Sequence, residues 1–240
     1  MLKRFHRALK KIATEKDRFD PTQFGDDLAN QISWKPARSV GINFRVRKLI
    51  IEEPHLAKFR ITAGAILFGL FFMLMFTCIP SAIVLANLPK QSDGTLTIDS
   101  RLLPLVVGPA ISFTGILFIY FQLTPIRFDK KAGYFRKGRK AAKVGMHQKT
   151  DFSIGLVELN DVHALQLLAK TFGRSGTDQS YELNLVLKTG QRLNVVTQGG
   201  RTRMQKDAST LSQFLEVPLW DASRFVIGRW KQMPTQKIEF

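Results

Sequence analysis

The sequence is poor in the residues that build disulfide frameworks and metal clusters. Its 240 residues include a single cysteine, Cys78, and four histidines that are scattered without the spacing of metal ligands. One thiol gives no disulfide framework and no thiolate cluster. We therefore expect no disulfide, no bound metal and no cofactor.

Patterns typical of catalysis are also missing. Asp161 and His163 are close in sequence, but no serine or cysteine nucleophile lies near them, so we interpret them as a structural pair. The glycines form no phosphate-binding loop of the required form. We expect a protein that is not an enzyme, and no small-molecule substrate is evident.

Acidic residues are scarce. The chain has 36 lysines and arginines against 19 aspartates and glutamates, and a formal net charge of +17. Such a balance suggests nucleic acid as a partner. The basic residues are densest beside two long apolar stretches, however, which is typical of proteins that face anionic lipid. Nucleic acid is therefore the less favoured partner.

Charge is absent from these two apolar stretches, 61–87 and 102–124. As a helix, the first would be about 40 Å long, more than the ~30 Å hydrocarbon layer of a bilayer. We predict two transmembrane helices joined by a short periplasmic loop at 88–101. The excess of basic residues outside this loop predicts a multi-pass protein of the bacterial inner membrane, with both termini in the cytoplasm. Small residues that allow close helix packing are Ala65, Gly69, Gly108, Ser112 and Gly115.

Residues 1–20 predict a basic amphipathic helix, because apolar residues recur there at intervals of three and four. Two interpretations stay open: the helix lies on the inner leaflet, or it is a solvated helix packed on the protein's own domain. The basic residues of its polar side are Lys3, Arg4, Arg7, Lys10 and Lys11.

The rest of the chain carries signals of strands and one helix. Residues 21–60 predict a cytoplasmic segment with two short strands separated at Glu53-Pro54, which pair with the C-terminal region. IRFDKKAGYFRKG at 126–138 predicts a hairpin. YELNLVLKTGQRLNVV at 181–196 predicts an antiparallel hairpin with one buried face. Apolar residues from Met204 to Leu215 predict an amphipathic helix ended by Pro218, whereas residues 155–172 fit a helix or a strand equally well.

These two hairpins, together with DASTLSQFLEVPLWD at 207–221, resemble the pleckstrin-homology-like (PH-like) domain of uncharacterised bacterial two-span inner-membrane proteins. The resemblance implies a small antiparallel β domain at 125–240, closed by a C-terminal helix, with 162–172 as a strand. The expected fold class is then an α+β membrane protein. Such a scaffold binds partners or lipid and rarely catalyses.

Three functions follow from these expectations. The first and favoured one is an interaction or scaffold domain, held at the membrane and presented to a protein partner or to a second copy. The second is a sensor of anionic lipid headgroups, with the charge supplied by Lys137, Arg139, Lys140 and Lys143. The third is a small oligomeric channel or a transport accessory subunit.

Overall fold

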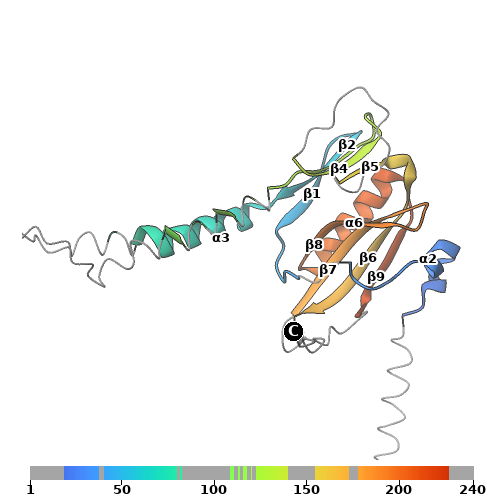
Figure 1. Ribbon diagram of the computed structural model, residues 1–240, viewed down its shortest axis with the longest axis horizontal. Helices are drawn as coiled ribbons and strands as arrows, with labels where there is room; N and C mark the ends of the chain where they lie inside the picture. Colours follow the sequence, from blue (N-terminus) through green and yellow to red (C-terminus); the bar gives the residue numbers. More distant parts are fainter. Residues whose placement is uncertain are drawn as a thin grey trace, which may run out of the picture. The chain divides into compact units, whose positions relative to one another are not determined.

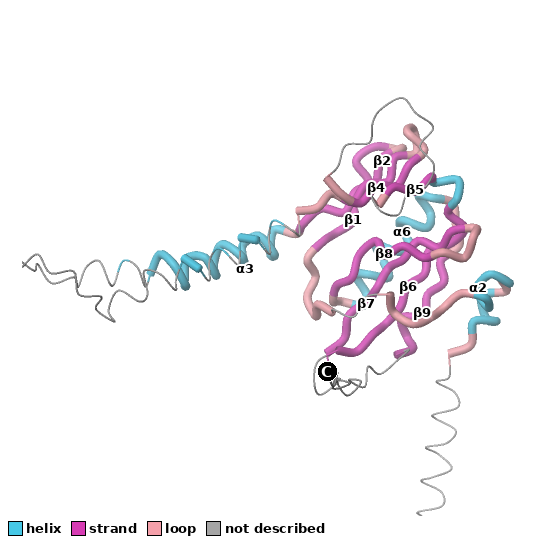
Figure 2. Tube along the Cα trace, in the orientation of Figure 1, coloured by secondary structure: helices cyan, strands magenta, loops and turns pink. Residues whose placement is uncertain are grey.

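The computed structural model describes residues 19–37, 41–79, 123–139, 155–172 and 178–226, and a few isolated positions between 82 and 120 (Figures 1 and 2). The chain divides into two compact units. Unit 1 contains the described residues up to Arg45, the segment Leu49–Lys58 and the described residues from Ile126 onward. Unit 2 contains Val46–Lys48 and the described residues within Phe59–Pro125.

The first sheet has five strands in the order β1-β2-β3-β4-β5. They are β1 (Arg47–Glu53), β2 (Leu56–Ile61), β3 (Ile126–Asp129), β4 (Tyr134–Lys137) and β5 (Leu156–Glu158). The hairpin of β3 and β4 places Phe128 opposite Phe135, and these two buried rings lie 4.7 Å apart. The two predicted strands before residue 62, their pairing with the C-terminal region and the hairpin at 126–138 are confirmed.

The second sheet has four strands in the order β8-β7-β6-β9. They are β6 (Val162–Phe172), β7 (Asp178–Leu187), β8 (Arg192–Gln198) and β9 (Leu219–Val226). β7 pairs antiparallel with β6 and β8, and β9 pairs parallel with β6. The predicted hairpin at 181–196 is confirmed, with Gly190 at positive φ in its turn, where glycine carries no steric penalty. Residues 162–172 are a strand, as the resemblance implied.

Helix α6 (Arg201–Leu215) packs on one face of this sheet, where it contacts β6, β7 and β9 (Figure 1). Its buried residues Met204, Ala208 and Leu211 follow the predicted helical spacing, so this helix is confirmed. Glu216 ends it in the left-handed conformation, and Pro218 follows.

The prediction of an antiparallel domain closed by a C-terminal helix is wrong. Strand β9 follows α6 and makes the sheet mixed, because its parallel pairing with β6 adds a fourth strand. The physical reason lies in the residues after Pro218. Trp220 and Ala222 are two positions apart and both are buried, which is the spacing of an extended strand.

The other face of the second sheet is covered by the segment Phe19–Ala37, called the strap below. It contains the short helices η1 (Pro21–Phe24) and α2 (Asp27–Gln31), which are capped by the side chains of Asp20 and Asp26. The second sheet is therefore buried on both faces. The expectation that its hairpin has only one buried face is wrong, since Glu182 and Asn184 of β7 have no exposed surface.

The predicted transmembrane hairpin is also wrong. In the described part of 61–87, helix α3 (Ala63–Met73) continues into a π-helix, η2 (Leu74–Cys78). No helix among the described residues is long and apolar enough to cross a membrane, which overturns the two spans and the inner-membrane location predicted from them.

Candidate functional site: the strap-binding face

An aromatic cluster fixes the strap to the sheet. Trp34 lies 4.5 Å from the ring of Phe19 and stacks on Phe24 with ring centroids 5.2 Å apart. On the sheet side, Trp34 lies 6.1 Å from Trp220, and Phe19 lies 5.5 Å from Phe225. Aromatic pairs at such distances stabilise a contact beyond the area that they bury. Trp34 is therefore the central anchor of the strap.

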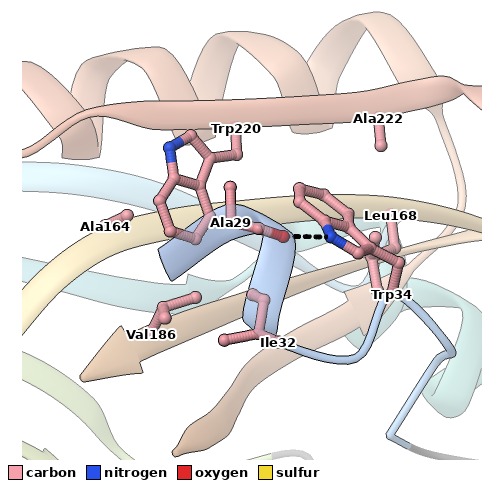
Figure 3. Close-up of a cluster of buried hydrophobic side chains, with 8 residues drawn as sticks. All are labelled: Ala29, Ile32, Trp34, Ala164, Leu168, Val186, Trp220 and Ala222. Carbon is pink, nitrogen blue, oxygen red and sulfur yellow. Dashed lines mark hydrogen bonds between the residues drawn. The ribbon is translucent and has the colours of Figure 1, made fainter. Parts of the chain in front are cut away.

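The indole N–H of Trp34 also has a partner, the backbone oxygen of Ala29 at 2.8 Å (Figure 3). This bond joins Ala29, in the middle of α2, to the extended part of the strap, so the anchor and the helix form one unit. The turn at Gly190 lies against α2, where an added Cβ would contact Leu28 and Ile32. On the sheet, small and aliphatic residues complete the buried cluster that contains Trp34: Ala164, Leu168, Val186 and Ala222.

Beside this apolar floor lies a row of polar side chains on the same sheet face. The row consists of Gln166, Glu182, Asn184, Arg192 and Asn194. Gln166, Glu182 and Asn184 are completely buried. Burying a polar group costs free energy unless the group forms a hydrogen bond. The hydrogen-bond partners of the polar row therefore indicate which groups this face binds.

The row binds the backbone of the strap at every second residue. The amide nitrogen of Gln166 donates to the oxygen of Ser33 at 3.3 Å. The guanidinium of Arg192 donates to the oxygen of Lys35 at 3.0 Å, and the N–H of Ala37 donates to the Glu182 carboxylate at 2.8 Å. Positions 33, 35 and 37 share one side of an extended chain, whose side chains alternate with a period of two. The sheet therefore recognises the strap here by its main chain.

Charge strengthens this recognition. Hydrogen bonds to ionised groups are roughly twice as strong as those between neutral groups. Burial lowers the pKa of the Arg192 guanidinium, and the nearby Glu182 carboxylate acts in the opposite direction. The two side chains are linked through the polar row, because Arg192 also donates to Gln166 and Asn184 donates to both Gln166 and Glu182. The row is thus a connected network.

Lys137 of β4 contacts the last residue of the polar row, Asn194. Its ammonium donates to the backbone oxygen of Asn194 at 2.7 Å and to the Asn194 side chain at 3.1 Å. Asn194 in turn donates to Asn184 and to Thr197. This contact places an ammonium on the edge strand β8, where a lysine discourages pairing with another strand.

At the other end of the strap, His163 of β6 forms a 2.7 Å contact with the carboxylate of Asp26. Burial raises the pKa of Asp26, but the hydrogen bonds from His163 and from the N–H of Leu28 outweigh it, so the pKa is lowered overall. Asp26 therefore caps α2 and ties it to the sheet.

The residues proposed from sequence for lipid headgroups are placed as follows. Lys137 contacts Asn194, and Arg139 is exposed shortly after β4. Lys140 and Lys143 lie outside the described residues. The predicted structural pair of Asp161 and His163 does not describe the observed contact, because His163 pairs with Asp26.

The remaining sequence-based site residues are only partly described. Ala65 and Gly69 lie in α3. The basic residues of the predicted N-terminal helix and the small residues of the second apolar stretch lie outside the described residues: Lys3, Arg4, Arg7, Lys10, Lys11, Gly108, Ser112 and Gly115.

Sequence reasoning missed the strap and the polar row. The alternation of Glu182 and Asn184 with leucines is the usual pattern of a half-exposed strand, so both residues were expected to face solvent. Trp34 was the available signal. A tryptophan between two short polar segments has no apolar neighbours in sequence that could bury it. Its burial therefore requires an apolar surface from a distant part of the chain.

No family model matches the sequence, and no curated protein matches it. Among the described residues, no group of three or more histidines, cysteines, aspartates or glutamates could hold a metal ion. The geometry of the strap-binding face is therefore the basis for the functional argument.

Proposed function

We propose that this protein is a non-enzymatic interaction module that binds a linear protein segment on the face of its second sheet. The observation that carries the proposal is the binding of the strap backbone at Ser33, Lys35 and Ala37 by Gln166, Arg192 and Glu182. In peptide-binding domains, main-chain hydrogen bonds supply affinity and pockets for individual side chains supply specificity. Here the contacts of Trp34 with Phe24 and Trp220 would supply the specificity.

The chemistry of the face supports this function over a purely structural contact. A structural contact needs only apolar packing, which the aromatic cluster already provides. The polar row adds buried charged and amide groups whose partners are backbone atoms of the strap. Removing the strap would leave these groups without those partners, so the face is suited to hold a peptide.

The test is to free the strap from its covalent connection after folding. A specific protease site placed between Ala37 and Gly41 is cut in the folded, full-length protein, so that only non-covalent contacts retain the strap. A labelled peptide of residues 19–37 is then titrated in, and fluorescence anisotropy reports binding. We expect saturable binding to the cut protein and none to the uncut protein, whose own strap occupies the face.

The matched control is the same peptide with Trp34→Ala. Truncation of a buried tryptophan costs about 3–5 kcal/mol, which corresponds to a loss of affinity on the order of 10²–10³-fold. Equal binding of the two peptides, or equal binding to cut and uncut protein, would show that the strap-binding face is not a peptide site.

A further inference from the structure

The side chains in the extended part of the strap alternate between buried and exposed. The buried ones are those of Ile32, Trp34 and Pro36. The exposed ones are those of Ser33, Lys35 and Ala37. Side chains of an extended chain alternate in this way, with a period of two. The strap is therefore held by side chains at three alternate positions, and Trp34 is the middle one.

The main chain of the same segment presents one edge to the polar row. In an extended chain, the N–H and C=O of one residue point to one edge, and those of the next residue point to the other. The groups bound by the row belong to Ser33, Lys35 and Ala37. Pro36 lies between two of them, so its backbone belongs to the opposite edge and its missing N–H removes no bond to the row. A proline at position 37 would instead remove the donor to Glu182.

Pro36 also restricts the backbone on which the two charged side chains of the row act. Its ring holds φ near −65° and disfavours helical conformations of the preceding residue, Lys35. Arg192 donates to the oxygen of Lys35, and Glu182 accepts from the N–H of Ala37, so these bonds lie on either side of the proline. A segment that is already extended when free loses less conformational entropy on binding. Pro36 therefore favours binding both by its burial and by this restriction.

These observations, together with the proposed function on which the inference rests, define the segments that the face selects. We propose that its partner is a linear protein segment with an aliphatic residue, a tryptophan and a proline at alternate positions, followed directly by a residue that has a backbone N–H. Pro36 is a specificity-determining residue of this pattern. The position of Lys35 tolerates substitution, because its side chain is exposed and only its backbone is bound. A segment that carries the tryptophan alone is bound much more weakly.

The test measures the affinity of the cut protein for the labelled peptide of residues 19–37 and for three variants of it. Pro36→Ala should weaken binding about 10- to 100-fold, because the peptide loses part of a buried ring and becomes more flexible when free. The double change Pro36→Ala and Ala37→Pro keeps the composition but moves the proline by one position. It should weaken binding about tenfold more than Pro36→Ala does, because Glu182 loses the N–H of residue 37. Lys35→Gln is the matched control at an exposed position and should stay within about twofold.

The outcomes separate this inference from the proposed function. Equal affinity for the original and the Pro36→Ala peptide would overturn the selection for proline and leave the peptide site intact. A peptide with the moved proline that binds as tightly as the Pro36→Ala peptide would overturn the assignment of the bound edge. A loss with Lys35→Gln as large as that with Pro36→Ala would show that the face does not select alternate positions. No binding of any peptide would overturn the proposed function itself.

Discussion

Replacing Trp34 with alanine in the uncut protein isolates the contribution of the anchor. Trp34 is 8% exposed, and its ring contacts Phe19, Phe24 and Trp220. Its loss removes the stacking partner of Phe24 and leaves a cavity that the short strap helices fill only in part. Large-to-small changes of this kind cost about 3–5 kcal/mol. The strap is one peripheral layer of unit 1, so we expect this cost to appear as local detachment before the sheet unfolds.

Hydrogen exchange measures that detachment residue by residue. In the native strap, the amide of Ala29 donates to Asp26 and that of Ala37 donates to Glu182. A loss of 3–5 kcal/mol predicts that these amides exchange about 10²–10³ times faster in Trp34→Ala, up to the limit set by the free strap. Amides in the pairing of β6 and β7 should keep their protection, because α6 still covers the opposite face.

The matched control is Trp34→Phe. It retains an aromatic ring in the cluster but removes the indole N–H, so the buried oxygen of Ala29 loses its partner, at a cost of about 1–3 kcal/mol. We expect an intermediate acceleration in the same amides. Unchanged exchange in the strap of Trp34→Ala would refute the anchor role, and equal acceleration in the strap and in β6 would show that the two unfold as one unit.

Two further predictions concern the framework that holds this face. Gly199→Ala should destabilise unit 1 by about 1–3 kcal/mol in chemical denaturation, because the new Cβ would overlap the backbone of Asn43, whereas Gly64→Ala meets open space and should not. Asp207, which pairs with Arg45, has a raised pKa because burial outweighs that pairing. The folded state therefore binds the proton more tightly than the unfolded state, so this group contributes most to the unfolding free energy below pH 3.8, and the contribution falls as the pH rises through the folded pKa. The difference in unfolding free energy between wild type and Asp207→Asn should follow that dependence, and a pH-independent difference would contradict it.

Local patterns in the sequence were sufficient to predict several elements. The two hairpins follow from alternation and from turn glycines, and α6 follows from the spacing between Met204 and Leu211. These patterns depend on residues a few positions apart, so the elements can be predicted without knowledge of the fold. The order of the strands up to β5 is also simple, since each neighbour in the sheet follows in the chain.

Long-range packing was not predictable in the same way. Whether Glu182 faces solvent depends on a segment about 150 residues earlier, and nothing in the local alternation of β7 encodes that cover. The parallel addition of β9 depends likewise on its distant partner β6. The prediction for the apolar stretch at 61–87 rested on its length and lack of charge alone, and no helix among the described residues meets the requirements for a membrane span.

The position of the strap near the start of the chain affects how the protein is made. The strap leaves the ribosome before its binding face exists, because β9, which carries Trp220, is synthesised roughly 180 residues later. At about 5–20 residues per second, this interval lasts on the order of 10–40 s. During that time Trp34 and its neighbouring phenylalanines have no sheet to cover them. The aromatic side chains of the strap therefore stay without their partners on β9 until the last strand has been synthesised.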